Sequence, residues 1–263
     1  MPIDDTMALV LRALGAGFNL PEVLALYAPL LARQSTAAVR RSDNLRYGPH
    51  ERQVLDVFEP QAGGSDGDGE GKGDGPKPVL VVVHGGGFVR GDKSAKANLG
   101  WYFAGKGIVT ALPNYRLAPQ GQWPSGPQDV AAVVAWLREH AASFGGDPQR
   151  IVLLGESAGA AHVAAAVLMR RFEVDAAVGV RGAVLVSGPY NARLERLARA
   201  AFGVETPDPR NDAYFGSDDH AALAPASIAL NIDAAPLPLL VTFAQRDLLP
   251  MQACQDPADH VLF

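Results

Sequence analysis

The chain has 263 residues, of which 48% are hydrophobic and 19% charged, with a formal net charge of −5 and a pI near 5.7. This composition is typical of a globular protein, and the length suits a single domain, residues 1–263, with a sizeable core. The acidic balance provides no basic stripe that would attract phosphate backbones, so nucleic acid is not expected as a partner.

The cysteine content and the N-terminus bear on cellular location. Cys254 is the only cysteine, so no internal disulfide can form, and no metal-ligand cluster surrounds it. Residues 1–5 are acidic where a secretory signal would be basic, and no apolar run approaches the roughly 18 residues of a membrane span. We expect a cytoplasmic protein with no membrane span, no metal and no cofactor.

The N-terminal quarter predicts helices, a strand and then a loop. Leucines and a valine recur at partly helical spacing over residues 7–33, which indicates two short amphipathic helices in an N-terminal helical cap segment, residues 1–45. Residues 54–58 are typical of a strand, and the glycine- and aspartate-rich residues 61–76 of a flexible loop. The start of this loop resembles a calcium-binding loop, but Lys77 stands where that loop needs a glutamate.

Beyond the loop, apolar strands alternate with helical segments. Strands are predicted at residues 79–83, 108–112, 151–154, 182–186 and 237–243, and helices at 125–140 and 157–169. This alternation indicates an α/β fold, a mostly parallel central sheet with helices on both faces. Residues 190–233 mix arginines and chain breakers with short apolar groups, and we expect them to form a small, partly helical lid.

The first chemical motif is Gly155-Glu156-Ser157-Ala158-Gly159, which fits G-x-S-x-G between a buried strand and a helix. Small residues at its two ends permit a sharp turn that holds the Ser157 hydroxyl above the sheet, at a helix N-terminus that favours negative charge. The motif predicts a nucleophilic serine. The alternative is an ordinary strand-to-helix turn in which serine serves as the N-cap.

The second motif is His84-Gly85-Gly86-Gly87-Phe88, which directly follows the strand at residues 79–83. In acyl transfer the carbonyl oxygen becomes an oxyanion, and glycines let backbone N–H groups approach it. We expect the N–H groups of Gly86, Gly87 and Ala158 to form an oxyanion hole. A phosphate-binding or dinucleotide-binding loop is the alternative, but the spacing and residues that those loops need are missing.

Together with other short motifs, these residues resemble the hormone-sensitive-lipase-like carboxylesterases of the α/β-hydrolase fold. The match covers residues 79–170 closely and is carried by His84–Gly87, Tyr115–Pro119, Trp123-Pro124, Asp129, Trp136-Leu137, Gly145–Pro148, Arg150 and Gly155–Gly159. Upstream, the stretch from Tyr47 to Pro60 is similar to related short esterases and to arylformamidases, which hydrolyse formyl-kynurenine. The resemblance implies an α/β-hydrolase without fixing its substrate.

In the family, the acid of the catalytic triad follows the strand after the lid. Asp247, in Gln245-Arg246-Asp247-Leu248-Leu249-Pro250, matches that place. Its carboxylate would fix the tautomer of the catalytic imidazole and stabilise the imidazolium formed when Ser157 gives up its proton. A surface aspartate at the end of a strand is the alternative interpretation.

The catalytic histidine is the least determined part of the site. In the family it usually follows the acid by some tens of residues, whereas only residues 248–263 follow Asp247, and His260 is the only histidine among them. His260 is therefore the candidate base. A C-terminally truncated product is the competing explanation, and it predicts an exposed apolar edge at residues 237–243 and only residual catalysis.

The other histidines are weaker candidates. His162 belongs to the helix after Ser157, His140 ends a covering helix, His220 lies in the lid, and His84 has a structural role in the oxyanion loop. The sequence thus predicts a cofactor-free serine hydrolase that cleaves small or medium acyl esters, a small-molecule substrate, through an acyl-enzyme on Ser157. The alternatives are amide cleavage of an N-formyl aromatic substrate and a catalytically impaired hydrolase scaffold.

Overall fold

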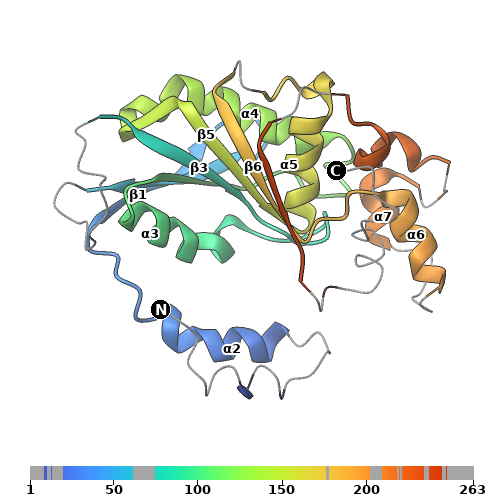
Figure 1. The fold of residues 1–263 in the computed structure, drawn as a ribbon, viewed down its shortest axis with the longest axis horizontal. Helices are drawn as coiled ribbons and strands as arrows, with labels where there is room; N and C mark the ends of the chain where they lie inside the picture. The colour runs from blue at the N-terminus through green and yellow to red at the C-terminus, as the bar shows by residue number, and fades with distance from the viewer. Residues whose placement is uncertain are drawn as a thin grey trace.

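The computed structural model describes residues 9, 10, 13, 20–61, 75–175, 178–201, 209–217, 219, 221–233, 237–244 and 247. They form a central sheet with helices on both faces (Figure 1), which confirms the predicted fold class. The strands are β1 (Val39–Arg46), β2 (Val54–Pro60), β3 (Lys77–Val83), β4 (Val109–Pro113), β5 (Gly146–Glu156), β6 (Val180–Val186) and β7 (Leu239–Thr242). The α-helices are α2 (Leu20–Leu31), α3 (Ala97–Gly105), α4 (Ser125–His140), α5 (Ala158–Leu168), α6 (Ala192–Ala201) and α7 (Pro209–Phe215).

The sheet has the order β1-β2-β4-β3-β5-β6-β7. β2 pairs antiparallel with β1 and with β4, and the strands from β4 to β7 run parallel. The carboxyl ends of β3, β5, β6 and β7 therefore lie at one edge. In open parallel sheets this edge is where ligands bind, and here both chemical motifs follow strands that end there.

Alternating residues of β3 show why its sequence is apolar from residue 79 to residue 83. Val81 and Val83 pack into the larger core, which includes residues of α4 and α5, while Leu80 and Val82 pack into the smaller core on the opposite face, beside Ala104 of α3. A strand covered on both faces must be apolar at every position. The helices α4 and α5 thus cover one face of the sheet and α3 the other.

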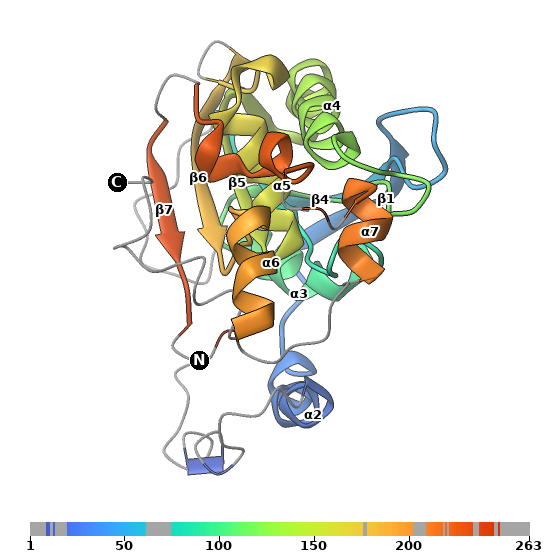
Figure 2. The ribbon, with the colours of Figure 1, turned by 90° about the vertical axis from the view of Figure 1, so that its right-hand side faces the viewer.

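The structure corrects the expected N-terminal cap segment. Residues 39–45, the end of the predicted helical segment 1–45, belong instead to the antiparallel edge strand β1. The sequence of this strand is polar because one edge of β1 is unpaired within the described sheet and each of its residues is exposed or half-buried. Helix does occur before it, in α2, which lies apart from the sheet in both views (Figure 2).

Two other sequence predictions concern the edges of the described structure. Residues 62–74 of the glycine-rich loop lie outside the described residues. β7 pairs only with β6 among the described strands, and Leu240 and Phe243 are more than half exposed there. Because residues 248–263 lie outside the described residues, the exposed apolar edge stays a prediction. Within the described part of the chain, no helix has the length and hydropathy that crossing a membrane requires.

The segment from 190 to 233 is partly helical, as predicted. Its described residues include α6, α7 and the two 3-10 turns Ala224–Ala226 and Ile228–Leu230. α7 approaches the loop after β3 through Tyr214, whereas Leu197 of α6 is half-exposed. A role of this segment as a lid remains a prediction.

Candidate active site

Ser157 sits in a strained turn between β5 and α5. Its backbone has φ 54° and ψ −122°, a conformation that costs a non-glycine residue about 1–3 kcal/mol. The turn is fixed on both sides, because the Ser157 N–H donates to the Val186 carbonyl at 2.9 Å and the Ala161 N–H donates to the Ser157 carbonyl at 3.1 Å. Ser157 is half-buried rather than turned into the interior.

The two glycines of the motif are required by the packing around this turn. A Cβ at Gly155 would collide with the Gly159 carbonyl, and one at Gly159 would collide with the carbonyls of Val83 and His84 at the end of β3. Glycine thus lets the start of α5 lie directly against the neighbouring strand. This explains why the G-x-S-x-G spacing accompanies the strained serine.

The triple-glycine loop lies beside the serine. A Cβ placed on Gly85 would lie 3.1 Å from the Ser157 Cβ and 3.0 Å from the Glu156 carbonyl oxygen. The neighbouring Gly86 and Gly87 have φ values of 141° and 59°, and the loop is closed by a hydrogen bond from the Arg90 N–H to the Gly86 carbonyl at 3.2 Å. The two motifs therefore meet at the carboxyl edge of β3 and β5.

Ala158 is the first residue of α5, and it is buried. The leading N–H groups of a helix have no carbonyl partner inside it, and no side chain caps this helix. The helix therefore starts with backbone donors directly after Ser157, where its dipole favours an anion.

The His84 side chain hydrogen-bonds to the backbone of the glycine loop. It is buried, its ring stacks on Tyr115 with centroids 4.4 Å apart, and its Nδ1 lies 2.7 Å from the Gly85 carbonyl, which assigns the proton to Nδ1. The Tyr115 hydroxyl donates in turn to the His84 carbonyl at 3.0 Å. Burial lowers the pKa of His84 to about 4, so the imidazole is neutral at pH 7.

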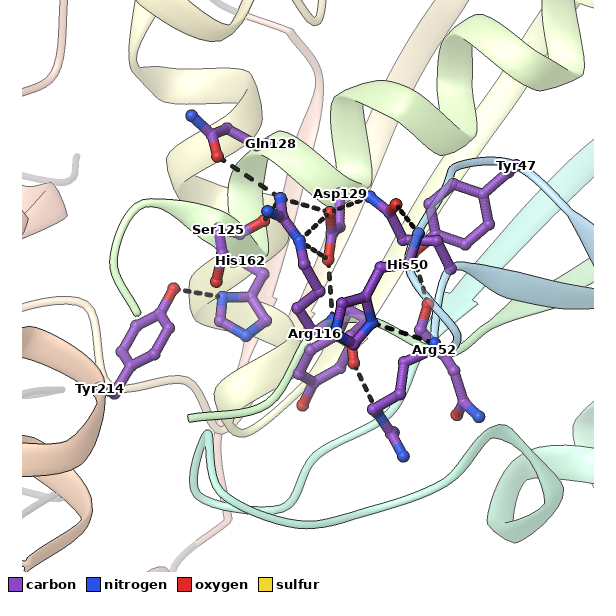
Figure 3. Close-up of polar contacts among 12 residues, drawn as sticks. Tyr47, His50, Arg52, Arg116, Ser125, Gln128, Asp129, His162 and Tyr214 are labelled. Carbon is purple, nitrogen blue, oxygen red and sulfur yellow. Dashed lines mark hydrogen bonds and ion pairs between the residues drawn. The ribbon is translucent and has the colours of Figure 1, made fainter. Parts of the chain in front are cut away.

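A buried carboxylate organises the segment beneath the loop (Figure 3). Asp129 accepts from the Arg116 N–H at 2.8 Å, from the Arg116 guanidinium at 2.7 Å and from Gln53 Nε2 at 2.8 Å. Its side chain is only 1% exposed, and a charge so buried persists only when paired and hydrogen-bonded. Asp129 therefore ties the chain after β4 to α4 and to the turn before β2.

Arg52 extends this support to the glycine loop. It donates through Nε to the Tyr115 carbonyl at 2.8 Å and through Nη2 to the Gly91 carbonyl at 2.9 Å. Tyr47 is buried, and its hydroxyl donates to the Asn114 carbonyl at 2.5 Å. Tyr47 and Arg52, both from the 47–60 stretch, therefore hydrogen-bond to backbone carbonyls around the site.

His162 lies in a cluster of aromatic rings that includes Tyr214 of α7. It is buried, contacts the rings of Tyr115, Phe88 and Tyr214, and has its Nδ1 3.4 Å from the Tyr214 hydroxyl (Figure 3). Burial, and to a smaller degree the nearby His84, lowers the pKa of His162 to about 3. His140 is exposed on α4, where its ring stacks on Trp136, and His220 lies outside the described residues.

Asp247 follows β7 and closes a short turn. Its Oδ2 accepts from the Ala244 N–H at 3.0 Å, and its own N–H donates to the Ala244 carbonyl at 3.1 Å. Tyr190, which follows the neighbouring β6, is buried, and its pKa is raised by burial and by the charge of Asp247. Asp247 thus belongs to the same edge of the sheet as Ser157, two strands away, while His260 lies outside the described residues.

Sequence reasoning missed three residues that surround these motifs. Lys96 forms an ion pair with Glu156, the residue before the serine, Tyr214 stacks on Phe88, and the pKa of Tyr190 is raised in part by the charge of Asp247. Each interaction joins segments far apart in the chain, and none of the three residues stands in a motif. No local pattern in the sequence could have revealed them.

Comparison with known proteins places the chain in a family. Residues 80–255 match the model of a protein family whose description is alpha/beta hydrolase fold. The chain belongs to this family. The matched range includes the serine turn and the triple-glycine loop described above.

Curated relatives of this α/β-hydrolase include esterases. It is 35% identical over 174 residues to an isoprenylcysteine alpha-carbonyl methylesterase of Arabidopsis thaliana, covering 62% of the chain and 38% of the relative. It is 40% identical over 86 residues to a carboxylesterase of Mycobacterium tuberculosis, covering 31% of the chain and 26% of the relative. The hydrolase chain spans roughly a quarter to two fifths of the length of the curated relatives it matches.

Solved structures share the fold of this hydrolase. Esterase B from Lactobacillus rhamnosis superimposes with a TM-score of 0.66 at 22% identity, covering 90% of the chain and 78% of that structure. At this identity the likeness establishes the fold alone.

Proposed function

We propose that this α/β-hydrolase cleaves carboxylic esters of small or medium acyl groups through a covalent acyl-enzyme on Ser157. The observation that carries the proposal is the half-buried serine, held at φ 54° directly beside the triple-glycine loop. A strained residue at the carboxyl edge of a parallel sheet is expected where its side chain is used. The esterase relatives support the same reaction class.

In this mechanism the Ser157 hydroxyl attacks the ester carbonyl. The carbonyl oxygen gains the negative charge and accepts hydrogen bonds from the N–H groups of Gly86, Gly87 and Ala158. The C–O bond to the alcohol then breaks, which leaves the acyl group on Ser157. Water attacks the acyl-enzyme by the same route and releases the acid.

The proton of Ser157 must pass to a base and then to the departing alcohol. We assign this role to His260, with Asp247 accepting from its imidazole, because the order serine, acid, histidine is that of α/β-hydrolases. His84 and His162 are poorly suited, since both are buried with pKa values far below 6.5. His260 therefore stays a prediction from its position in the sequence.

The experiment is active-site labelling with a fluorophosphonate, read beside hydrolysis of p-nitrophenyl acetate. We expect wild-type protein to label rapidly and Ser157→Ala to lose both labelling and turnover. His260→Gln should retain the fold and lose most of the turnover. A folded wild-type protein that neither labels nor turns over would overturn the proposal and favour an impaired scaffold.

The amide-cleaving alternative is distinguished by substrate. Tyr47 and Arg52, which carry the likeness to arylformamidases, are engaged with the carbonyls of Asn114, Tyr115 and Gly91, so a structural role explains why they are present. We expect kcat/KM for p-nitrophenyl acetate to exceed that for formyl-kynurenine. The reverse preference by a large factor would assign the site to formamide hydrolysis.

A further inference from the structure

An ion pair involves the residue next to the proposed nucleophile. Lys96 pairs through its Nζ with Oε2 of Glu156, which is the last residue of β5 and directly precedes Ser157. The two side chains are 21% and 42% exposed, so the pair is partly shielded from water. Within the part of the chain that the structure describes, Lys96 is the only partner of this carboxylate. The mechanism above gives neither residue a role.

The segment that carries Lys96 is anchored to the sheet. Lys96 ends the 3-10 turn Lys93–Lys96, whose first residue forms a buried ion pair with Asp56 of β2 at 2.7 Å. The Lys93 N–H also donates to Asn114 Oδ1 at 2.7 Å, just after β4. These contacts hold the backbone of the turn against two strands, so Lys96 reaches Glu156 from a fixed position.

The ion pair is close to the loop that supplies the proposed oxyanion hole. A Cβ placed on Gly85 would lie 3.0 Å from the Glu156 carbonyl oxygen and 3.1 Å from the Ser157 Cβ. The charge of Lys96 also reaches this loop, because burial is the main cause of the low pKa of His84 and the ammonium of Lys96 adds a smaller part. The charges of the pair therefore act on the place where the oxyanion would form.

A carboxylate at this place opposes the proposed reaction unless its charge is compensated. The carbonyl oxygen of the ester becomes negative in the transition state, and like charges repel more strongly in a partly desolvated site than in bulk water. Lys96 supplies the compensating charge before the reaction starts, so nothing has to rearrange as the oxyanion forms. If the pair only joined the turn to β5, the loss of either partner would have the same effect.

We propose that Lys96 is a positioning residue of the reaction centre, which holds the Glu156 carboxylate in an ion pair and cancels the negative charge that would otherwise oppose the oxyanion beside Ser157. This inference rests on the proposed esterase function. Both side chains are partly exposed, so we expect the loss of Lys96 to lower kcat about 3- to 30-fold rather than by the larger factor of a buried charge. KM should change little, because the repulsion arises only as the oxyanion forms.

Charge variants, compared by hydrolysis of p-nitrophenyl acetate, test the inference. Lys96→Gln should lower kcat by the stated factor and change KM by less than about twofold, and Lys96→Arg should keep most of the activity. Glu156→Gln alone should lower kcat less than Lys96→Gln does. The double variant Lys96→Gln/Glu156→Gln should recover most of what Lys96→Gln loses. In 0.5 M salt the defect of Lys96→Gln should shrink, because the partly exposed carboxylate is screened.

Lys106→Gln is the matched control, because it removes the same charge from an exposed position just after the C-terminal end of α3. It should behave as wild type. Equal losses in Lys96→Gln and Glu156→Gln, with no recovery in the double variant, would assign the pair a purely structural role and overturn the inference. Wild-type kcat in Lys96→Gln would overturn it as well. Denaturant unfolding checks that each variant is compared as folded protein.

A binding measurement separates this inference from the proposed function. Phenylboronic acid forms a bond from boron to the Ser157 oxygen, releases the hydroxyl proton and becomes a tetrahedral anion, so its Kd reports how well the site holds negative charge without turnover. Weaker binding to Lys96→Gln than to wild type, with recovery in the double variant, supports the inference even if no ester is hydrolysed. Equal Kd values in the three proteins, or no binding to wild type, overturn it, whereas failure to hydrolyse any ester counts only against the esterase function.

Discussion

The rings of Phe88 and Tyr214 are stacked, with centroids 4.4 Å apart and planes 4° from parallel. Phe88 directly follows the triple glycine and has a positive φ of 68°, while Tyr214 belongs to α7 in the 190–233 segment. The pair joins the loop beside Ser157 to the segment predicted as a lid. The position of α7 and the conformation of the loop are therefore coupled.

Replacing Tyr214 tests this coupling. Tyr214 is 1% exposed, and truncating a buried aromatic residue typically costs about 3–5 kcal/mol. We expect Tyr214→Ala to lose about that much free energy of unfolding in urea, and Tyr214→Phe, which keeps the stacked ring, to lose about 1 kcal/mol or less. An alanine variant as stable as the phenylalanine variant would show that the stack does not hold α7.

Gly159 provides a test of the close packing at the start of α5. A Cβ there would collide with the carbonyls of Val83 and His84, so we expect Gly159→Ala to lose at least about 2 kcal/mol of stability and all fluorophosphonate labelling. Gly105 of α3 is the matched control, because a Cβ there meets nothing within 4 Å. Gly105→Ala should be neutral or stabilising by up to about 1 kcal/mol, and similar losses at both positions would contradict the packing argument.

The two buried histidines predict acid sensitivity. Burial lowers the pKa of His84 to about 4 and that of His162 to about 3, whereas in the unfolded chain both titrate near 6.5. Between these values the unfolded state binds more protons, so the free energy of unfolding falls as the pH decreases below about 6.5. His84 alone accounts for about 3 kcal/mol by pH 4, since each pKa unit corresponds to 1.36 kcal/mol.

Denaturant unfolding between pH 7.5 and 5 measures this slope. His162→Gln should have a shallower pH dependence than wild type, whatever its stability at pH 7.5. His140→Gln, which replaces an exposed histidine on α4, should keep the wild-type slope. A slope unchanged in His162→Gln would mean that this imidazole is accessible to protons in the folded state.

The regular parts of the fold follow from local sequence. Apolar runs located β3, β4, β6 and β7 to within two residues, and the helical pattern gave the bounds of α4. β1 was missed because its sequence, VRRSDNLR, is polar at an exposed edge, and α3 was missed because it has only nine residues, two of which are glycines. The first half of β5 was also missed, because Asp147 to Arg150 interrupt its apolar pattern.

The motifs of the candidate site follow from sequence, but their surroundings do not. The G-x-S-x-G and triple-glycine motifs have local backbone requirements, and glycine spacing records them. The stacking of Tyr214 on Phe88 and the ion pair between Lys96 and Glu156 depend on how segments far apart in the chain pack together. A single sequence carries no signal for such contacts.

Asp247 is expected to matter for rate and little for stability. It is held by its own short turn with Ala244, which asparagine can preserve through its carbonyl oxygen. If Asp247 orients the base, Asp247→Asn should lower kcat for p-nitrophenyl acetate by about 10⁴-fold and shift the midpoint of thermal unfolding little. Asp219→Asn, an exposed carboxylate in the 190–233 segment, is the control, and loss of activity in both variants would point to a general charge effect.

At position 157, the residue that would give the most stable backbone differs from the residue that the proposed reaction requires. A glycine there would adopt φ 54° and ψ −122° without strain, so the serine is retained at the expense of about 1–3 kcal/mol. If Ser157 is the nucleophile, as proposed, this loss of stability is offset only by the reaction. A chain without the activity would gain stability from glycine at this position.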